Sequence, residues 1–151
     1  MQHTFLLQEG FWQLSGRFSN ISGIEIPVEG RTIVTHTPDQ WSNHAFMRIL
    51  TAQPQDIETV YTFAPIPPKA TFVQWDSTSP MLGNVPGCFA FVDDTIISSS
   101  IIASTGQHAT EALRFVNENR YETRGALFQS DTLLASWRVL MQRIEHTDKL
   151  Q

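Results

Sequence analysis

Two of the five histidines lie close together along the chain and are candidates for metal binding. His36 and His44 flank a turn at residues 38–40, and a hairpin there would bring their imidazoles near each other. Neutral imidazole is a common ligand of metal ions and haem. No third ligand follows at the spacing of a metal motif, and the alternative is a pair of exposed hairpin histidines. The sequence therefore predicts no metal and no cofactor.

Other polar residues are weaker candidates for catalysis. Arg48 could bind a carboxylate if it faced inward, but the odd face of its segment is the more apolar one, which predicts that Arg48 points outward. Asp93 and Asp94 look like paired catalytic carboxylates, yet aspartates between two strands are typical of a tight turn. The serines at 98–100 lack a Gly-x-Ser-x-Gly context, and Cys88 is expected to be a small buried residue. No catalytic residue is predicted, and whether the protein is an enzyme stays open.

The aromatic residues make a ligand pocket the stronger candidate site. Large aromatic side chains usually pack the core, and that is the alternative interpretation. Four tryptophans fill a small barrel awkwardly, however, unless the interior has space to spare. The residues expected to line such a pocket are Trp41, Met47, Tyr61, Trp75, Phe91 and Trp137.

Composition limits the classes of protein and partner. The 151 residues fit one domain, 1–151, and 41% of them are hydrophobic, which is enough for a packed interior. The 15 acidic and 10 basic residues give a net charge of −5, which argues against nucleic-acid binding. A single cysteine excludes an intrachain disulfide. No segment has the length of a membrane span or the pattern of a signal peptide, so we expect a cytoplasmic protein.

Alternation with a period of two dominates the chain, and turn residues interrupt it every 8 to 12 positions. This spacing is typical of an antiparallel sandwich or barrel. Segment 109–116 would also fit one face of a helix, although the turn that follows favours a strand. Long loops are expected at 20–30 and 77–87 because both contain proline and glycine. The expected strands are 12–18, 31–37, 41–51, 57–63, 71–75, 89–92, 95–103, 109–116, 121–129 and 132–144.

About eight to ten consecutive strands with short connections form a meander. Closing into a barrel is the simplest way for a small domain to remove its sheet edges, although a two-sheet sandwich remains open. The second face of the last strand carries Leu134, Leu140 and Ile144, which suggests a contact between two copies of the chain. The predicted fold class is thus all-β, with a single antiparallel meander barrel.

The opening of the first strand carries a family resemblance. The residues GFW at 10–12 resemble the Gly-x-Trp motif of lipocalins and the wider calycin group. The resemblance implies that Trp12 plugs one end of a barrel and that a late basic residue, here Arg143, packs across its ring. Gly16 would let the first strand bend where the wall curves. The single cysteine and the short polar C-terminus favour an intracellular or bacterial type.

The resemblance and the aromatic residues together predict binding of a small hydrophobic or amphipathic molecule inside the barrel. Two alternatives stay open. One is a barrel enzyme that isomerises or cyclises a hydrophobic substrate or attaches a pigment, by analogy of fold. The other is a filled barrel that acts only through contacts with other proteins.

Overall fold

The computed structural model describes residues 2–145, which form strands joined by turns and short loops. No helix of that part of the chain is long and apolar enough to cross a membrane. The ten strands are β1 (Gly10–Ser19), β2 (Glu25–His36), β3 (Trp41–Ile49), β4 (Gln55–Phe63), β5 (Phe72–Ser79), β6 (Gly83–Val92), β7 (Thr95–Ile102), β8 (Gln107–Asn117), β9 (Arg120–Gln129) and β10 (Thr132–Ile144).

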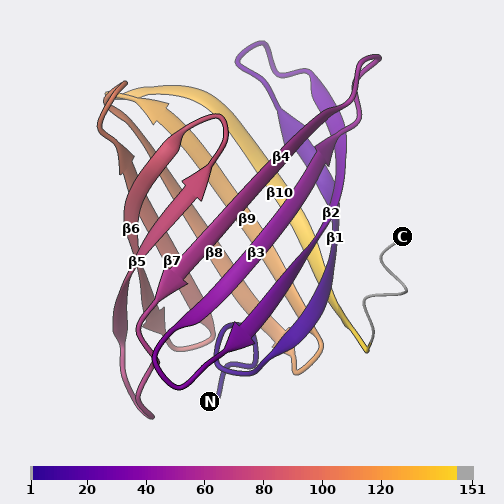
Figure 1. The fold of residues 1–151 in the computed structure, drawn as a ribbon. Helices are drawn as coiled ribbons and strands as arrows, with labels where there is room; N and C mark the ends of the chain where they lie inside the picture. The colour runs from indigo at the N-terminus through magenta and orange to yellow at the C-terminus, as the bar shows by residue number, and fades with distance from the viewer. Residues whose placement is uncertain (1, 146–151) are drawn as a thin grey trace.

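The strands form one closed antiparallel barrel (Figure 1) in which each strand pairs with its neighbours in sequence and β10 returns to pair with β1. The closing ladder runs from the pair Phe11 and Ile144 to the pair Ser19 and Ser136. The predicted all-β meander barrel is therefore confirmed. Closure gives every strand two neighbours, so neither end of the meander is left as an exposed sheet edge.

Two of the expected long loops are largely strand. β2 already begins at Glu25, and only three residues separate β5 from β6, so the predictions of loops at 20–30 and 77–87 were wrong. Both errors involve a proline within a strand. Pro27 pairs with β1, but the ladder from β2 to β3 begins one residue later. Pro86 pairs with β5, but the ladder from β6 to β7 also begins one residue later. A proline lacks a backbone N–H and is tolerated where a strand is paired on one side only.

Alternation along each strand separates an inner from an outer face. Segment 109–116, which fitted either a strand or a helix, lies within β8. Its inward positions include the buried Leu113 and the partly buried Phe115, which packs against the core. Of the residues suggested for a contact between two copies, Leu134, Leu140 and Ile144 keep part of their surface exposed. That contact stays a prediction.

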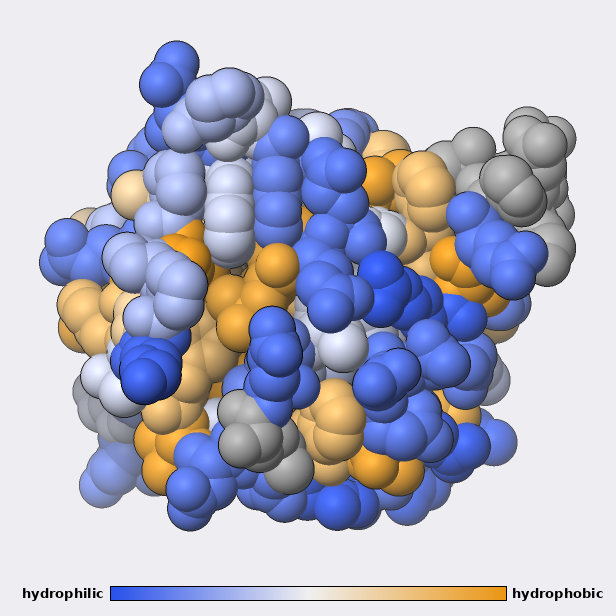
Figure 2. Space-filling view, turned by 90° about the horizontal axis from the view of Figure 1, so that it is seen from below, coloured by the Kyte–Doolittle hydropathy of each residue, from blue (hydrophilic) through white to orange (hydrophobic). Residues whose placement is uncertain are grey.

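The segment before β1 covers one end of the barrel. Phe5 and Leu6 are 3% and 0% exposed, and Leu6 adopts a positive φ of 73°. Hydrogen bonds fix the segment to the turns at this end: the Thr4 hydroxyl donates to the Glu118 carbonyl, and His36 bonds to the Leu6 carbonyl. Figure 2 views this end from below, where hydrophilic residues surround smaller hydrophobic patches. We call it the closed end.

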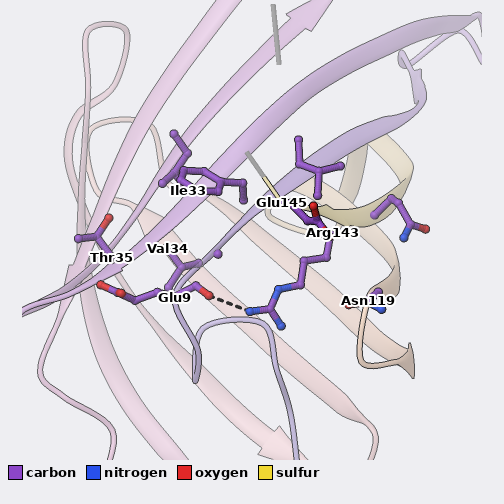
Figure 3. Close-up of a pocket in the computed structure, with 11 residues that line it drawn as sticks. Glu9, Ile33, Val34, Thr35, Asn119, Arg143 and Glu145 are labelled. Atoms are coloured by element: carbon purple, nitrogen blue, oxygen red, sulfur yellow. Dashed lines mark hydrogen bonds between the residues drawn. The ribbon is translucent and has the colours of Figure 1, made fainter. Parts of the chain in front are cut away.

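Trp12 and Arg143 meet at the closed end, opposite each other in the ladder between β1 and β10. The guanidinium carbon of Arg143 lies 5.8 Å from the centre of the Trp12 ring, and the indole is fully buried. Arg143 also donates to the Gln8 side chain and to the Glu9 carbonyl, at 2.9 Å each. Figure 3 shows it reaching Glu9 beside a surface hollow. Arg143 thus links the covering segment to the wall.

His3 attaches this segment to β9 and to the turn between β6 and β7. Its Nε2 lies 2.9 Å from the Asp93 carbonyl, an acceptor, so Nε2 carries the proton, and Nδ1 accepts from the Tyr121 hydroxyl at 2.7 Å. Burial lowers the pKa of His3 below its usual 6.5. The unfolded chain then takes up a proton at a higher pH than the folded protein does. The resulting stabilisation is complete above about pH 6.5 and is lost as the pH falls below it.

We therefore expect the midpoint of thermal unfolding to fall more steeply between pH 7 and pH 5 in the native protein than in a His3→Gln variant. The other histidines are the same in both proteins, so the difference between the two curves isolates His3. Parallel curves over this range would show that His3 contributes nothing to the pH dependence.

Candidate functional site

The barrel encloses a cavity of about 300 Å³, so its interior is not completely filled. This volume lies at the lower end of the range for small-molecule sites. Most of the surrounding side chains are apolar. The cavity is lined by Phe5, Leu14, Phe18, Val28, Thr32, Asn43, Ala45, Met47, Ile49, Ile57, Tyr61, Phe89, Ser98, Glu111, Leu113, Thr123, Trp137, Val139 and Met141.

A carboxyl group faces this cavity. Glu111 on β8 lies opposite Gly125 on β9, which lies opposite Trp137 on β10. A Cβ atom at Gly125 would come within 2.3 Å of the Trp137 indole, so only glycine leaves the ring room to cross β9. The indole N–H then donates to the Glu111 carboxylate at 2.8 Å. Three residues in register across three strands therefore place an acid in the wall of the cavity.

Burial sets the proton affinity of this acid. It raises the pKa of Glu111, and the bond from Trp137 opposes the rise because it favours the charged form. Tyr61 also lines the cavity, and its pKa is raised mainly by burial and further by the charge of Glu111. The interior therefore favours the protonated form of each.

The other polar groups of the wall are partly paired with one another. The Thr32 hydroxyl donates to the Asn43 side-chain oxygen, and the Thr123 hydroxyl lies 3.3 Å from the Met141 sulfur. Ser98 is buried and also borders the cavity. These neutral groups can orient a ligand but supply no charge.

The six residues expected to line a pocket divide into two groups. Met47, Tyr61 and Trp137 border the cavity, whereas Trp41, Trp75 and Phe91 lie elsewhere in or against the core. Trp41 stacks on His36 with the ring centres 3.6 Å apart, and Trp75 packs edge-on against Tyr61 at 5.0 Å. The role of the six in binding stays a prediction.

The polar candidates have local partners. His36 stacks on Trp41, and His44 lies 2.6 Å from the Glu58 carboxylate. Arg48 points outward as predicted and pairs with Asp56 at 2.7 Å. Asp93, with a φ of 51°, forms with Asp94 the tight turn between β6 and β7. Within residues 2–145, no group of three or more histidine, cysteine, aspartate or glutamate side chains is placed to hold a metal ion.

Glu111 is the functional candidate that the sequence analysis missed. Its odd residue number could have indicated it. Ala109, Leu113 and Phe115 are apolar and also odd, so they predict an inward strand face that includes Glu111. A helix over the same residues would have placed Glu111 differently. An acid at an inward position between apolar neighbours is unusual, since buried carboxylates need compensation.

Glu111 should lower the stability of the protein at neutral pH. Its pKa in the folded state is raised above the ordinary 4.5. Stabilisation from the protonated form is therefore complete below about pH 4.5 and is lost as the pH rises towards the folded-state pKa. A Glu111→Gln variant keeps an acceptor for Trp137 and does not titrate, so its stability relative to the native protein should increase from pH 4 to pH 8.

Unfolding by urea at a series of pH values tests this expectation. Glu29→Gln, at an exposed position on β2, is the matched control and should show no such increase. A constant difference between Glu111→Gln and the native protein across the range would refute the assignment of a buried titrating acid.

The end of the barrel opposite the covering segment differs from the closed end. Phe18, Ile49 and Ile57 line the cavity and are only partly buried. The connections at this end carry exposed apolar side chains: Ile21 and Ile24 between β1 and β2 are 70% and 60% exposed, and Met81 and Leu82 between β5 and β6 are 70% and 47% exposed. An apolar ligand approaching from this side would meet apolar surface first.

Comparison with known proteins concerns the fold. No family model and no curated protein matches the sequence. Among solved structures, the chain is similar to the S-type phycobiliprotein lyase CPES from Guillardia theta, with a TM-score of 0.67 over 94% of this chain and 91% of that one. The sequence identity is 12%, so the likeness shows the fold alone. The closed ten-stranded antiparallel barrel and this likeness together establish a calycin-like fold.

Proposed function

We propose that the protein binds a small hydrophobic or amphipathic molecule inside its barrel. The observation that carries the proposal is the cavity of about 300 Å³, whose wall is mostly apolar and contains a few polar groups near Glu111 and Tyr61. Ligand sites commonly combine such a wall with a small number of placed polar groups. Met47 and Trp137, both expected from the sequence to line a pocket, belong to this wall.

Binding would draw its free energy from burial of apolar ligand surface, at about 25 cal/mol per Å². The polar groups would fix the orientation of the ligand rather than supply most of the affinity. Entry from the end that carries Ile21, Ile24, Met81 and Leu82 fits the partial exposure of the lining there. The segment around Phe5 and Leu6 would keep the other end shut.

The first experiment is native mass spectrometry of the purified protein, to detect any molecule that it carries. In parallel, a panel of fatty acids, retinoids, haem and linear tetrapyrroles is tested by thermal unfolding and by tryptophan fluorescence, to which Trp137 in the cavity wall contributes. A ligand present at 100 times its Kd stabilises by about 2.7 kcal/mol, or about 5–10 °C in a domain of this size. If no bound molecule is found and the whole panel leaves both signals unchanged, the proposal is wrong.

Cavity-filling variants locate the site. Ala45→Leu and Ser98→Leu add volume inside the cavity, and each is expected to weaken binding of any ligand found by at least about tenfold. Ala112→Leu adds three carbon atoms at an exposed position on the outer face of β8 and should bind normally. Thermal unfolding without ligand shows which variants fold. Equal affinity in all three folded variants would place binding outside the cavity.

A second candidate function is catalysis on a bound hydrophobic substrate, including attachment of a pigment. It is favoured by the fold likeness to a phycobiliprotein lyase and by the two titratable groups that face the cavity, Glu111 and Tyr61. Burial raises the pKa of Glu111, which favours the protonated form that general acid catalysis requires. A Glu111→Gln variant that bound ligand normally but no longer converted it would support this function, and unchanged conversion would exclude Glu111 as the acid.

A further inference from the structure

The wall of the cavity carries charge of only one sign. Among the described residues that border it, Glu111 is the only one with a side chain that can be fully charged near neutral pH, and no lysine, arginine or histidine is present. Arg48, between the cavity-lining Met47 and Ile49 on β3, faces outward and pairs with Asp56 there. A cation that entered the cavity could therefore pair with Glu111, whereas an anion would find no opposite charge there.

One oxygen of Glu111 is available to a ligand. The Trp137 N–H donates to Oε2, and no described residue donates to Oε1. The Tyr61 side chain also borders the cavity, and its hydroxyl can accept as well as donate. A carboxylate oxygen and a phenol oxygen in the wall of one cavity are acceptors that an ammonium group, with three donors and no acceptor, would satisfy.

The same wall disfavours an anion. A ligand carboxylate would lose its hydration and gain no opposite charge, which is costly in a low-dielectric interior. It would also face the Glu111 side chain. Ser98 and Asn43 could offer hydrogen bonds to it, but these neutral groups supply no countercharge. A cation, by contrast, would restore the charged form of Glu111 and compensate for its burial.

We propose that the cavity selects an amphipathic ligand whose polar end is a protonated amine, held by Glu111 with Tyr61 as a further acceptor in the same wall, and that it rejects carboxylates of the same length. The inference rests on the proposed binding function and specifies the class of ligand. The apolar part would lie against the opposite wall, which includes Val28, Met47 and Ile57. Burial favours the protonated form of Glu111, so pairing with the amine would displace a proton from the share of Glu111 that is protonated.

Three probes that differ only in their polar end test the inference: decylamine, decanol and decanoate. Calorimetric titration at pH 7 is expected to give decylamine an affinity about 10- to 100-fold above that of decanoate, with decanol between them. Repeating the titration in buffers of different ionisation enthalpy measures proton release. Release should accompany decylamine and be absent for decanol.

Two variants assign the residues. Glu111→Gln should remove most of the preference for decylamine and all of the proton release, while its affinity for decanol stays within about twofold of the native value. Tyr61→Phe, which keeps the ring, should reduce the preference less. Glu29→Gln, on the outer surface, should behave like the native protein.

The outcomes separate this inference from the function on which it rests. Binding of decanoate as tight as that of decylamine would overturn the inference and leave ligand binding intact. Preference for decylamine that survived in Glu111→Gln would overturn the role of Glu111. Failure of all three probes would overturn the inference, and the larger ligand panel would decide separately whether the cavity binds anything.

Discussion

Replacing Trp12 with alanine is expected to lower the free energy of unfolding by about 3–5 kcal/mol, the usual cost of truncating a fully buried large aromatic residue. The indole is completely buried, and its ring centre lies 5.6 Å from those of Phe5 and Tyr121, both in edge-on contact. Truncation would also remove the ring against which Arg143 packs. Urea unfolding followed by circular dichroism measures the loss.

A Trp12→Phe variant refines this test. The indole nitrogen is buried and has no hydrogen-bond partner in the described part of the chain, so phenylalanine forfeits volume but no hydrogen bond. We expect it to cost clearly less than alanine. Because Trp12 does not border the cavity, folded Trp12→Phe should bind ligand with unchanged affinity. A cost for Trp12→Ala below about 1 kcal/mol would contradict a structural role at the closed end.

Adding a single methyl group at Gly16 is expected to destabilise the barrel by about 1–3 kcal/mol or more. A Cβ atom there would lie 2.0 Å from the Arg138 carbonyl oxygen on β10. The obstacle is backbone, which cannot rotate away as a flexible side chain does. Gly30 on the adjacent strand β2 has the same relation to the Phe46 carbonyl. At both positions the neighbouring strand leaves no room for a side chain. That Gly16 lets the first strand bend stays a prediction.

Ser15→Ala is the control for Gly16→Ala. It changes the neighbouring residue on the exposed outer face of β1 and should alter stability by no more than about 0.5 kcal/mol. Chemical unfolding of both variants under the same conditions gives the comparison. Equal stability of Gly16→Ala and the native protein would mean that the strands can separate locally without cost.

The fold was largely predictable because alternation reports directly on which face of a strand is buried. The same parity predicted that Arg48 faces outward, where it pairs with Asp56. Pro27 and Pro86 account for the wrong prediction of two loops, since a proline indicates a loop unless the strand is paired on one side only at that point. Whether a strand is paired on one side only at a proline depends on where its second ladder begins, here β2 with β3 and β6 with β7. The local sequence does not encode that position.

The site was less predictable because parity gives the direction of a side chain but not its depth along the barrel. Trp75 and Met47 occupy odd positions on their strands, yet Met47 borders the cavity and Trp75 packs in the core beside it. Glu111 was harder to predict, because its place in the site depends on Gly125 and Trp137. These two residues lie in line with Glu111 only after β8, β9 and β10 align in register. Such a relation between distant residues has no short motif.

The ladder between β1 and β10 has a kinetic consequence. Every other ladder joins strands that are adjacent in the chain, and each of those can form as a hairpin. The pairing of β1 with β10 alone must bring together residues from opposite ends of the sequence, so it bears the largest loop-closure entropy. We expect the rate-limiting step of folding to be the joining of this seam. Trp12 and Arg143, which face each other across it, would then act on the rate of folding as well as on the stability of the folded barrel.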